Sequence, residues 1–93
     1  MPKYYNYMVA GYYLYFTSHC IVEAMHVHAG NPELSAEVAA KFFVRKNGDT
    51  ELQKKGSLSD KDISKIRSFI KKNYKEMYQK WRKMSSEGFY GEE

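Results

Sequence analysis

The chain has a single cysteine, Cys20, and no long run of apolar residues. One cysteine cannot form an internal disulfide, which agrees with a reducing compartment. The apolar N-terminal part shows no basic leader followed by an aliphatic run, no small-residue cleavage site, and no stretch approaching the roughly 18 apolar residues of a membrane span. We therefore expect a cytoplasmic protein that contacts no membrane.

The signature motifs of several enzyme classes are also missing. The sequence has no glycine-rich phosphate loop, no paired-carboxylate motif and no hydrolase elbow that would present a nucleophilic serine. It contains no internal repeat or low-complexity tract. We expect no organic cofactor, but the residues are compatible with a bound divalent metal ion.

Tyrosine, in contrast, is abundant. Nine residues of the chain are tyrosine, and six of them lie in the first fifteen positions. Residues 4–9 and 12–16 are short aromatic and β-branched runs separated by Ala10-Gly11, a spacing typical of two strands joined by a tight turn. The sequence therefore predicts an N-terminal β-hairpin.

Turn signals separate further extended segments. Residues 17–25 have no clean period and are expected to form a loop, after which a strand begins at His26. Beyond a Gly-Asn-Pro turn signal, residues 34–43 alternate as a half-buried strand does. Asn47-Gly48 is a strong reverse-turn dipeptide, and residues 50–53 are expected to return as a short edge strand.

The clearest predicted element is a helix over residues 59–84. Ser59 is a good N-cap, and Leu58 can pack against Ile63 as a hydrophobic staple. Apolar residues then recur at three- and four-residue steps in one stripe: Ile63, Ile66, Ile70, Tyr74, Met77 and Trp81. At about 1.5 Å per residue the helix would be about 39 Å long, so its last turns are expected to overhang the sheet and to allow a homo-oligomer.

Strands followed by one helix predict an α+β fold, with a small antiparallel sheet of four to five strands packed against one long C-terminal helix. The 93 residues suffice for one modest core, so we expect a single domain. Its sheet would occupy about residues 4–55 and its helix residues 59–84, with a flexible tail at 85–93.

Positive charge is concentrated on the predicted helix. Between residues 59 and 84 there are nine Lys or Arg against three Asp or Glu, a net charge of +6, whereas the whole chain has +4. Such a surface favours phosphate-bearing or acidic partners, although a lysine-rich helix is often only a solvated face. RNA is therefore a candidate partner.

The candidate site is His26-Val27-His28. Alternate side chains of a strand share a face, so His26 and His28 would stand side by side while Val27 enters a core. Such a pair can serve as an acid and a base, or can ligate a divalent metal ion if the preceding loop supplies further ligands, for which His19, Glu23 and Cys20 are available. The alternative is that both histidines are ordinary half-exposed strand residues with a structural role.

An enzymatic use of the pair would be metal-independent RNA cleavage, in which one histidine deprotonates the 2′-hydroxyl and the other protonates the leaving oxygen. A cation would have to stabilise the phosphorane, and exposed tyrosines could stack the bases. The candidates for these binding roles are the cations Lys41, Arg45, Arg67 and Arg82 and the tyrosines Tyr13 and Tyr15.

With these landmarks placed, the chain resembles a family of short prokaryotic proteins classed only as a domain of unknown function, DUF4160. The resemblance covers most of the chain and rests on Met1-Pro2, on Gly11 leading an aromatic strand that ends in Phe16-Thr17-Ser18, on His26-Val27-His28, on Leu58-Ser59 and on Trp81. The family usually has proline before the histidines, where this chain has Ala24 and Met25, so the approach to the pair departs from the family pattern. The family's members are often encoded beside another small protein, in an arrangement similar to toxin–antitoxin pairs, which implies a small partner protein.

The sequence thus favours a small module of a toxin–antitoxin-like unit that works by binding a macromolecule, with a partner protein as the first candidate and RNA as the second. The alternative is a small RNA-cleaving or metal-dependent hydrolase that uses His26 and His28. In either case the sheet face that carries the histidines would be the functional surface.

Overall fold

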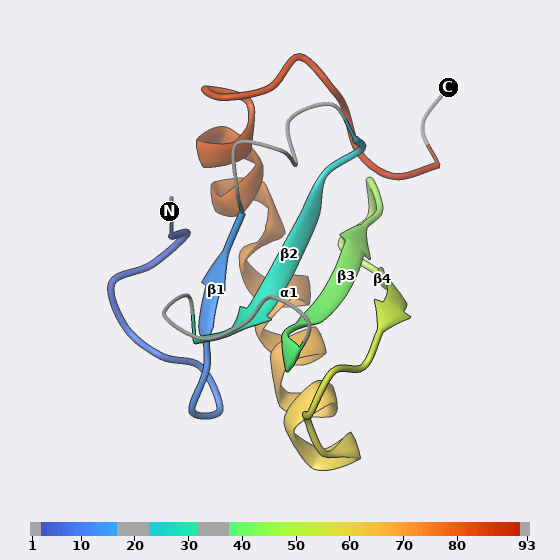
Figure 1. The fold of residues 1–93 in the computed structure, drawn as a ribbon. Coiled ribbons are helices and arrows are strands. Elements are labelled where there is room, and N and C mark those ends of the chain that lie inside the picture. The colour runs from blue at the N-terminus through green and yellow to red at the C-terminus, as the bar shows by residue number, and fades with distance from the viewer. Residues whose placement is uncertain (1–2, 17–22, 32–37, 92–93) are drawn as a thin grey trace.

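The computed structural model describes residues 3–16, 23–31 and 38–91. Within them, four strands and one helix follow in the order β1 (Tyr13–Tyr15), β2 (His26–Gly30), β3 (Ala40–Val44), β4 (Thr50–Lys54) and α1 (Asp60–Trp81). Each strand pairs antiparallel with the next, and α1 crosses behind the sheet (Figure 1). The predicted α+β fold, a small antiparallel sheet with one C-terminal helix, is confirmed.

The core lies between α1 and the sheet face that the helix covers. Alternation along β3 buries Ala40, Phe42 and Val44, and β2 contributes Val27 and Ala29. The predicted apolar stripe of α1 packs against them, with its buried members at Ile63, Ile66, Ile70, Met77 and Trp81. The remaining side chains of β2 and β3 therefore point to the opposite face of the sheet.

The turn between β3 and β4 forms at Asn47-Gly48, as predicted. Gly48 has a φ of +89°, a conformation that glycine adopts without strain. The Arg45 N–H donates to the Asp49 carbonyl at 2.8 Å across the turn. Lys71 of α1 donates to the Asn47 carbonyl and to the Asp49 carboxylate, both at 2.8 Å, which ties the turn to the helix. β4 at Thr50–Lys54 confirms the predicted return strand.

The N-terminal end of α1 is the predicted one. The Ser59 hydroxyl accepts a hydrogen bond from the backbone N–H of Asp62 at 3.1 Å, which satisfies one of the free donors of the first turn. Leu58 and Ile63 both belong to the core cluster, as the staple requires. Among the described residues, no helix is long and apolar enough to cross a membrane.

The C-terminal end of α1 lies in the core rather than beyond the sheet. The helix ends at Trp81, short of residue 84, and both Met77 and Trp81 have no exposed surface. The Trp81 ring lies 5.4 Å from the ring of Phe16, and its indole N–H donates to the Glu87 carbonyl at 3.0 Å. The expected overhang is therefore wrong, because the chain folds back over the last turns. The homo-oligomer stays a prediction.

The first tyrosine-rich run does not form the predicted hairpin strand. Val9 and Tyr12 exchange two backbone hydrogen bonds around Ala10-Gly11, at 2.7 and 3.0 Å, so the tight turn itself is present. Residues 4–8, however, are not a strand, and β1 has only three residues. Tyr4 and Tyr5 are both buried, at 1% and 8% exposure, and two consecutive inward side chains are incompatible with the alternation of a strand.

The strand predicted at residues 34–43 is described only in part. Residues 34–37 lie outside the described residues, as does most of the loop predicted at 17–25. The predicted pattern places Val38 on the same face as the buried Ala40 and Phe42, but Val38 is 42% exposed. The alternation therefore holds only from Ala40 onward. β3 then extends one residue beyond the predicted end, to Val44.

The segment after α1 crosses the start of β2 and the end of β3 (Figure 1). The Met25 N–H donates to the Gly88 carbonyl at 2.9 Å, and the Tyr90 N–H donates to the Val44 carbonyl at 2.8 Å. The Tyr90 ring stacks on Phe43 with the centroids 4.4 Å apart. These contacts were not predicted, since the sequence indicated a flexible tail at residues 85–93.

Candidate functional site

β2 presents the histidine pair on the sheet face opposite α1. Val27 and Ala29 belong to the core beneath the helix, so alternation directs His26 and His28 the other way. The two ring centroids lie 5.1 Å apart, and the rings are nearly perpendicular at 85°. The two imidazoles are therefore neighbours, as the spacing predicts.

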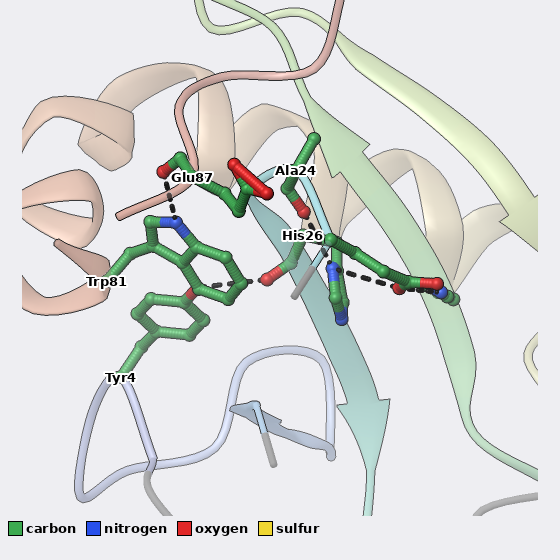
Figure 2. A network of polar contacts seen from close by, with 7 residues as sticks. Tyr4, Ala24, His26, Trp81 and Glu87 are labelled. Atoms are coloured by element: carbon green, nitrogen blue, oxygen red, sulfur yellow. Dashed lines mark hydrogen bonds and ion pairs between the residues drawn. The ribbon is translucent and has the colours of Figure 1, made fainter. Parts of the chain in front are cut away.

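His26 is enclosed by aromatic rings and has no exposed surface. The ring centroids of Trp81 and Phe43 lie 5.4 and 5.6 Å from its own. Figure 2 shows Tyr4, Trp81 and Glu87 beside the start of β2, where the Tyr4 hydroxyl donates to the His26 carbonyl at 2.9 Å. A substrate would have to displace aromatic side chains to reach this imidazole.

The two ring nitrogens of His26 have different surroundings. Nδ1 lies 2.9 Å from the Ala24 carbonyl oxygen, which can only accept, so Nδ1 is the nitrogen that carries the proton. Nε2 is buried, and no group in the described part of the chain forms a hydrogen bond with it. Burial lowers the pKa of His26, because an enclosed imidazolium would lose its hydration. The ring is thus a neutral imidazole with a bare lone pair on Nε2.

His28 is half-buried and stacks on Tyr15, with the ring centroids 5.4 Å apart. Burial lowers the pKa of His28 from 6.5 to about 4, helped by the repulsion that a protonated His28 would meet from His26, were it also protonated, and from Lys41. Both histidines are therefore neutral at physiological pH. General acid–base catalysis would require one of them to be protonated near neutrality.

An ion pair borders the histidines. The Lys41 ammonium lies 2.7 Å from Glu23 Oε2, and the same oxygen lies 3.7 Å from His26 Nδ1. The hydrogen bond from Lys41 holds the pKa of Glu23 below its ordinary value. Lys41 was a candidate for the phosphorane-stabilising cation, and Glu23 for a metal ligand. In the structure the two residues form an ion pair with each other.

The metal set proposed from the sequence is described only in part. His19 lies outside the described residues. Within the described part of the chain, no group of three His, Cys, Asp or Glu side chains is placed to hold a metal ion. His26, His28 and Glu23 therefore do not form a metal site by themselves, and the predicted divalent metal depends on His19 or Cys20, which both lie outside the described residues.

Of the other candidate residues, Tyr13 and Tyr15 lie on β1, whereas Arg82 lies at the C-terminal end of α1. Tyr15 is 1% exposed and packs on His28, so the expectation of an exposed stacking ring is wrong for this residue. Tyr13 is half-buried, with the Lys3 ammonium 4.1 Å from its ring centroid. Arg82 is the C-cap of α1.

Arg45 and Arg67, in contrast, come together in one surface hollow between the β3–β4 turn and α1. The hollow has a volume of about 650 Å³, and its other lining residues are Gly48, Asp49, Thr50, Ser68, Lys71 and Lys72. The contributions of Lys71 and Lys72 were not predicted. A signal was present in the sequence, because positions 67, 68, 71 and 72 are neighbours on one face of a helix.

A comparison with protein families identifies the chain. The model of a family described as Domain of unknown function (DUF4160) matches residues 11–82, which include all four described strands and α1. No curated protein and no solved structure matches the chain. The match spans well over half of the residues and includes the histidine pair, so this protein belongs to the DUF4160 family.

Proposed function

We propose that this domain works by binding a macromolecule, and that its histidine pair supports the fold instead of carrying out a reaction. The enclosure of His26 carries the proposal, since its ring has no exposed surface and its Nδ1 is bonded to the Ala24 carbonyl. A general acid or base must come within about 3 Å of the group that it protonates or deprotonates. The surrounding rings of Trp81 and Phe43 keep any substrate farther away than that.

The protonation state of the pair supports the same proposal. With a pKa of about 4, only about one His28 ring in a thousand is protonated at pH 7. Burial shifts the pKa of His26 in the same direction. The nearest cation, Lys41, is neutralised by Glu23 at 2.7 Å, so it offers little charge to a phosphorane.

The feature that supports binding to a partner is the positive charge on the exposed side of α1. The helical region carries the +6 noted above, and long-range attraction of this kind favours acidic or phosphate-bearing macromolecules. Members of the family that the chain resembles are often encoded beside another small protein, which suggests a partner of that kind for this domain. We therefore place the binding role in a toxin–antitoxin-like unit.

The proposal can be tested by incubating the purified protein with labelled RNA, with and without added divalent metal, and examining the RNA on a denaturing gel. We expect intact RNA. We also expect the small protein encoded beside this one, or RNA, to be retained by the tagged domain. Retention of neither would contradict a binding role.

His28→Gln is the matched variant, because glutamine keeps a polar side chain of similar reach but has no imidazole. RNA cleavage by the native protein that disappears in His28→Gln, with an unchanged circular dichroism spectrum, would favour the hydrolase alternative. Metal analysis of the purified protein then distinguishes a metal-independent RNA-cleaving enzyme from a metal-dependent hydrolase. One equivalent of zinc or manganese that is lost in the variant would identify the metal-dependent form.

A further inference from the structure

We infer that one continuous cationic surface, running over the exposed side of α1 and the β3–β4 turn, binds single-stranded RNA. This inference names the partner class of the binding role proposed above and rests on it. Three adjoining surface hollows carry it. The hollow of about 650 Å³ shares Arg45 with a second of about 500 Å³, and shares Ser68 and Lys72 with a third of about 410 Å³.

We call this surface the cationic band and define it by the Lys and Arg residues that line the three hollows: Lys65 and Lys72 in the third, Arg67 and Lys71 in the first, and Arg45 and Lys46 toward the second. Because neighbouring hollows share lining residues, they adjoin one another from the N-terminal turn at Val9 to the C-terminal segment at Tyr90. A chain of phosphates could follow it without leaving the surface.

Most of the charge in the cationic band is not neutralised. Arg45 pairs with Glu51 at 2.7 Å, and Lys71 pairs with Asp49 at 2.8 Å. For the other four cations of the band, the described residues supply no ion pair: Lys46, Lys65, Arg67 and Lys72. The two paired side chains are held in place by their acids, and the unpaired ones are available to a ligand.

The centre of the band has the groups that phosphate oxygens require. Arg67 supplies a planar fork of donors, and the hydroxyls of Thr50 and Ser68 lie in the same hollow. Gly48 of the β3–β4 turn lines the same hollow. Among the described residues, Asp49 is the one acid that lines this hollow, and Lys71 already neutralises it.

Aromatic side chains lie at both ends of the band, with Phe69 in the third hollow and Tyr90 in the second. The Arg45 guanidinium lies 5.0 Å from the Tyr90 ring centroid, and the Arg45 side chain is 42% exposed. A cationic groove interleaved with rings is typical of surfaces that bind single-stranded nucleic acid, because phosphates follow the charge and bases stack on rings or on guanidinium planes. An acidic protein would also match the charge, and the polyglutamate probe described below tests this competing partner class.

The test is fluorescence anisotropy with a labelled single-stranded RNA of about 12 nucleotides, long enough to span the site of a small domain. The test variant carries Arg67→Glu and Lys72→Glu, two exposed residues of the band. The matched control carries Lys61→Glu and Lys83→Glu, two exposed lysines near the ends of α1 and outside the three hollows. Both variants change the net charge by the same amount, and circular dichroism checks their folds.

We expect the native protein to bind the RNA with an affinity that falls steeply with salt. The band variant should bind at least about tenfold more weakly, and the control less than about threefold more weakly. Equal losses in the two variants, or no RNA binding by the native protein at low salt, would overturn the inference.

A labelled polyglutamate of similar length tests the competing partner class. If it binds as tightly as the RNA and with the same sensitivity to the band variant, the ligand is an acidic protein and the RNA inference fails. The same samples, run on a denaturing gel, separate this failure from that of the proposed function. Intact but unbound RNA contradicts only the RNA inference, whereas cleaved RNA contradicts the binding role itself.

Discussion

Lowering the pH from 7.5 to 5.0 should destabilise the fold by about 2 kcal/mol through His28 alone. The pKa of His28 is about 4 in the folded protein against an ordinary value of 6.5. Below pH 6.5 the unfolded chain therefore takes up a proton that the folded chain does not accept until about pH 4. Protons favour unfolding across this window, so stability is full above it and is lost as the pH falls.

The magnitude follows from the difference between the two pKa values. The full difference corresponds to about 3 kcal/mol, of which about 2 kcal/mol is lost by pH 5.0. The lowered pKa of His26 adds a loss of the same sign. Glu23 also has a lowered pKa, but its contribution is lost only as the pH falls below the ordinary value of 4.5. A domain of this size has a total stability of about 5–14 kcal/mol, so the histidine effect should be easily measured.

The assay is urea denaturation followed by circular dichroism at several values between pH 7.5 and 5.0. His28→Gln is the control, and its stability should depend less on pH than that of the native protein. The charged groups that act on His28 are His26, Glu23, Lys41 and Lys54, and Tyr15 stacks on its ring. A free energy of unfolding that is constant within about 0.5 kcal/mol, or an NMR titration that places the pKa of His28 near 6.5, would refute the reasoning.

Gly48→Ala should lower the free energy of unfolding, measured by urea denaturation, by about 1–3 kcal/mol. The φ of +89° strains alanine, and the new Cβ would meet the Tyr74 ring at 2.5 Å. Native-like stability would mean that the ring moves aside at no cost. Ser59→Ala should cost about 1 kcal/mol through the lost N-cap, whereas Ser59→Asp should be close to neutral, and equal effects of the two would argue against the cap. A chain ending at Ser86 loses the carbonyl that accepts the Trp81 indole N–H, so its tryptophan emission should shift to the red; an unchanged emission maximum would show that the C-terminal segment does not shield the ring.

The elements predicted correctly are those determined by local signals. The N-cap at Ser59 and the apolar stripe of α1 depend on neighbours within one or two helical turns, and both are confirmed. The Asn47-Gly48 turn depends on the freedom of glycine at positive φ, which is a property of the dipeptide itself. Alternation likewise predicted that His26 and His28 share a face.

The errors come from contacts between distant parts of the chain. The aromatic run at residues 4–9 has the composition of a strand, but Tyr5 packs edge-on against Phe69 of α1 while Tyr4 contacts Phe16. The C-terminal segment has the composition of a tail, yet Tyr90 forms a bridge with Arg45 at the end of β3. Composition does not indicate which distant surface a segment will cover.

The same limit applies to the histidine pair. Alternation along a strand predicts which side chains lie on the same face of the sheet. It does not predict which other segments cover that face. His26 is enclosed because Trp81, near the far end of the chain, lies 5.4 Å from its ring. The lowered pKa values of both histidines follow from the burial of each ring and could not be read from His26-Val27-His28 alone.

The two functional signals of the sequence are separated by the fold. His28 lies on the sheet face opposite the core, where it stacks on Tyr15, whereas Arg67 and Lys72 lie on the exposed side of α1. A phosphate held by Arg67 and Lys72 at the centre of the cationic band therefore has both the helix and the sheet between it and His28. A nuclease mechanism that combined the histidines with Arg67 would require one phosphate to touch both sides of the molecule. The fold thus divides charge from imidazoles, and binding at the band should be independent of any substitution at His28.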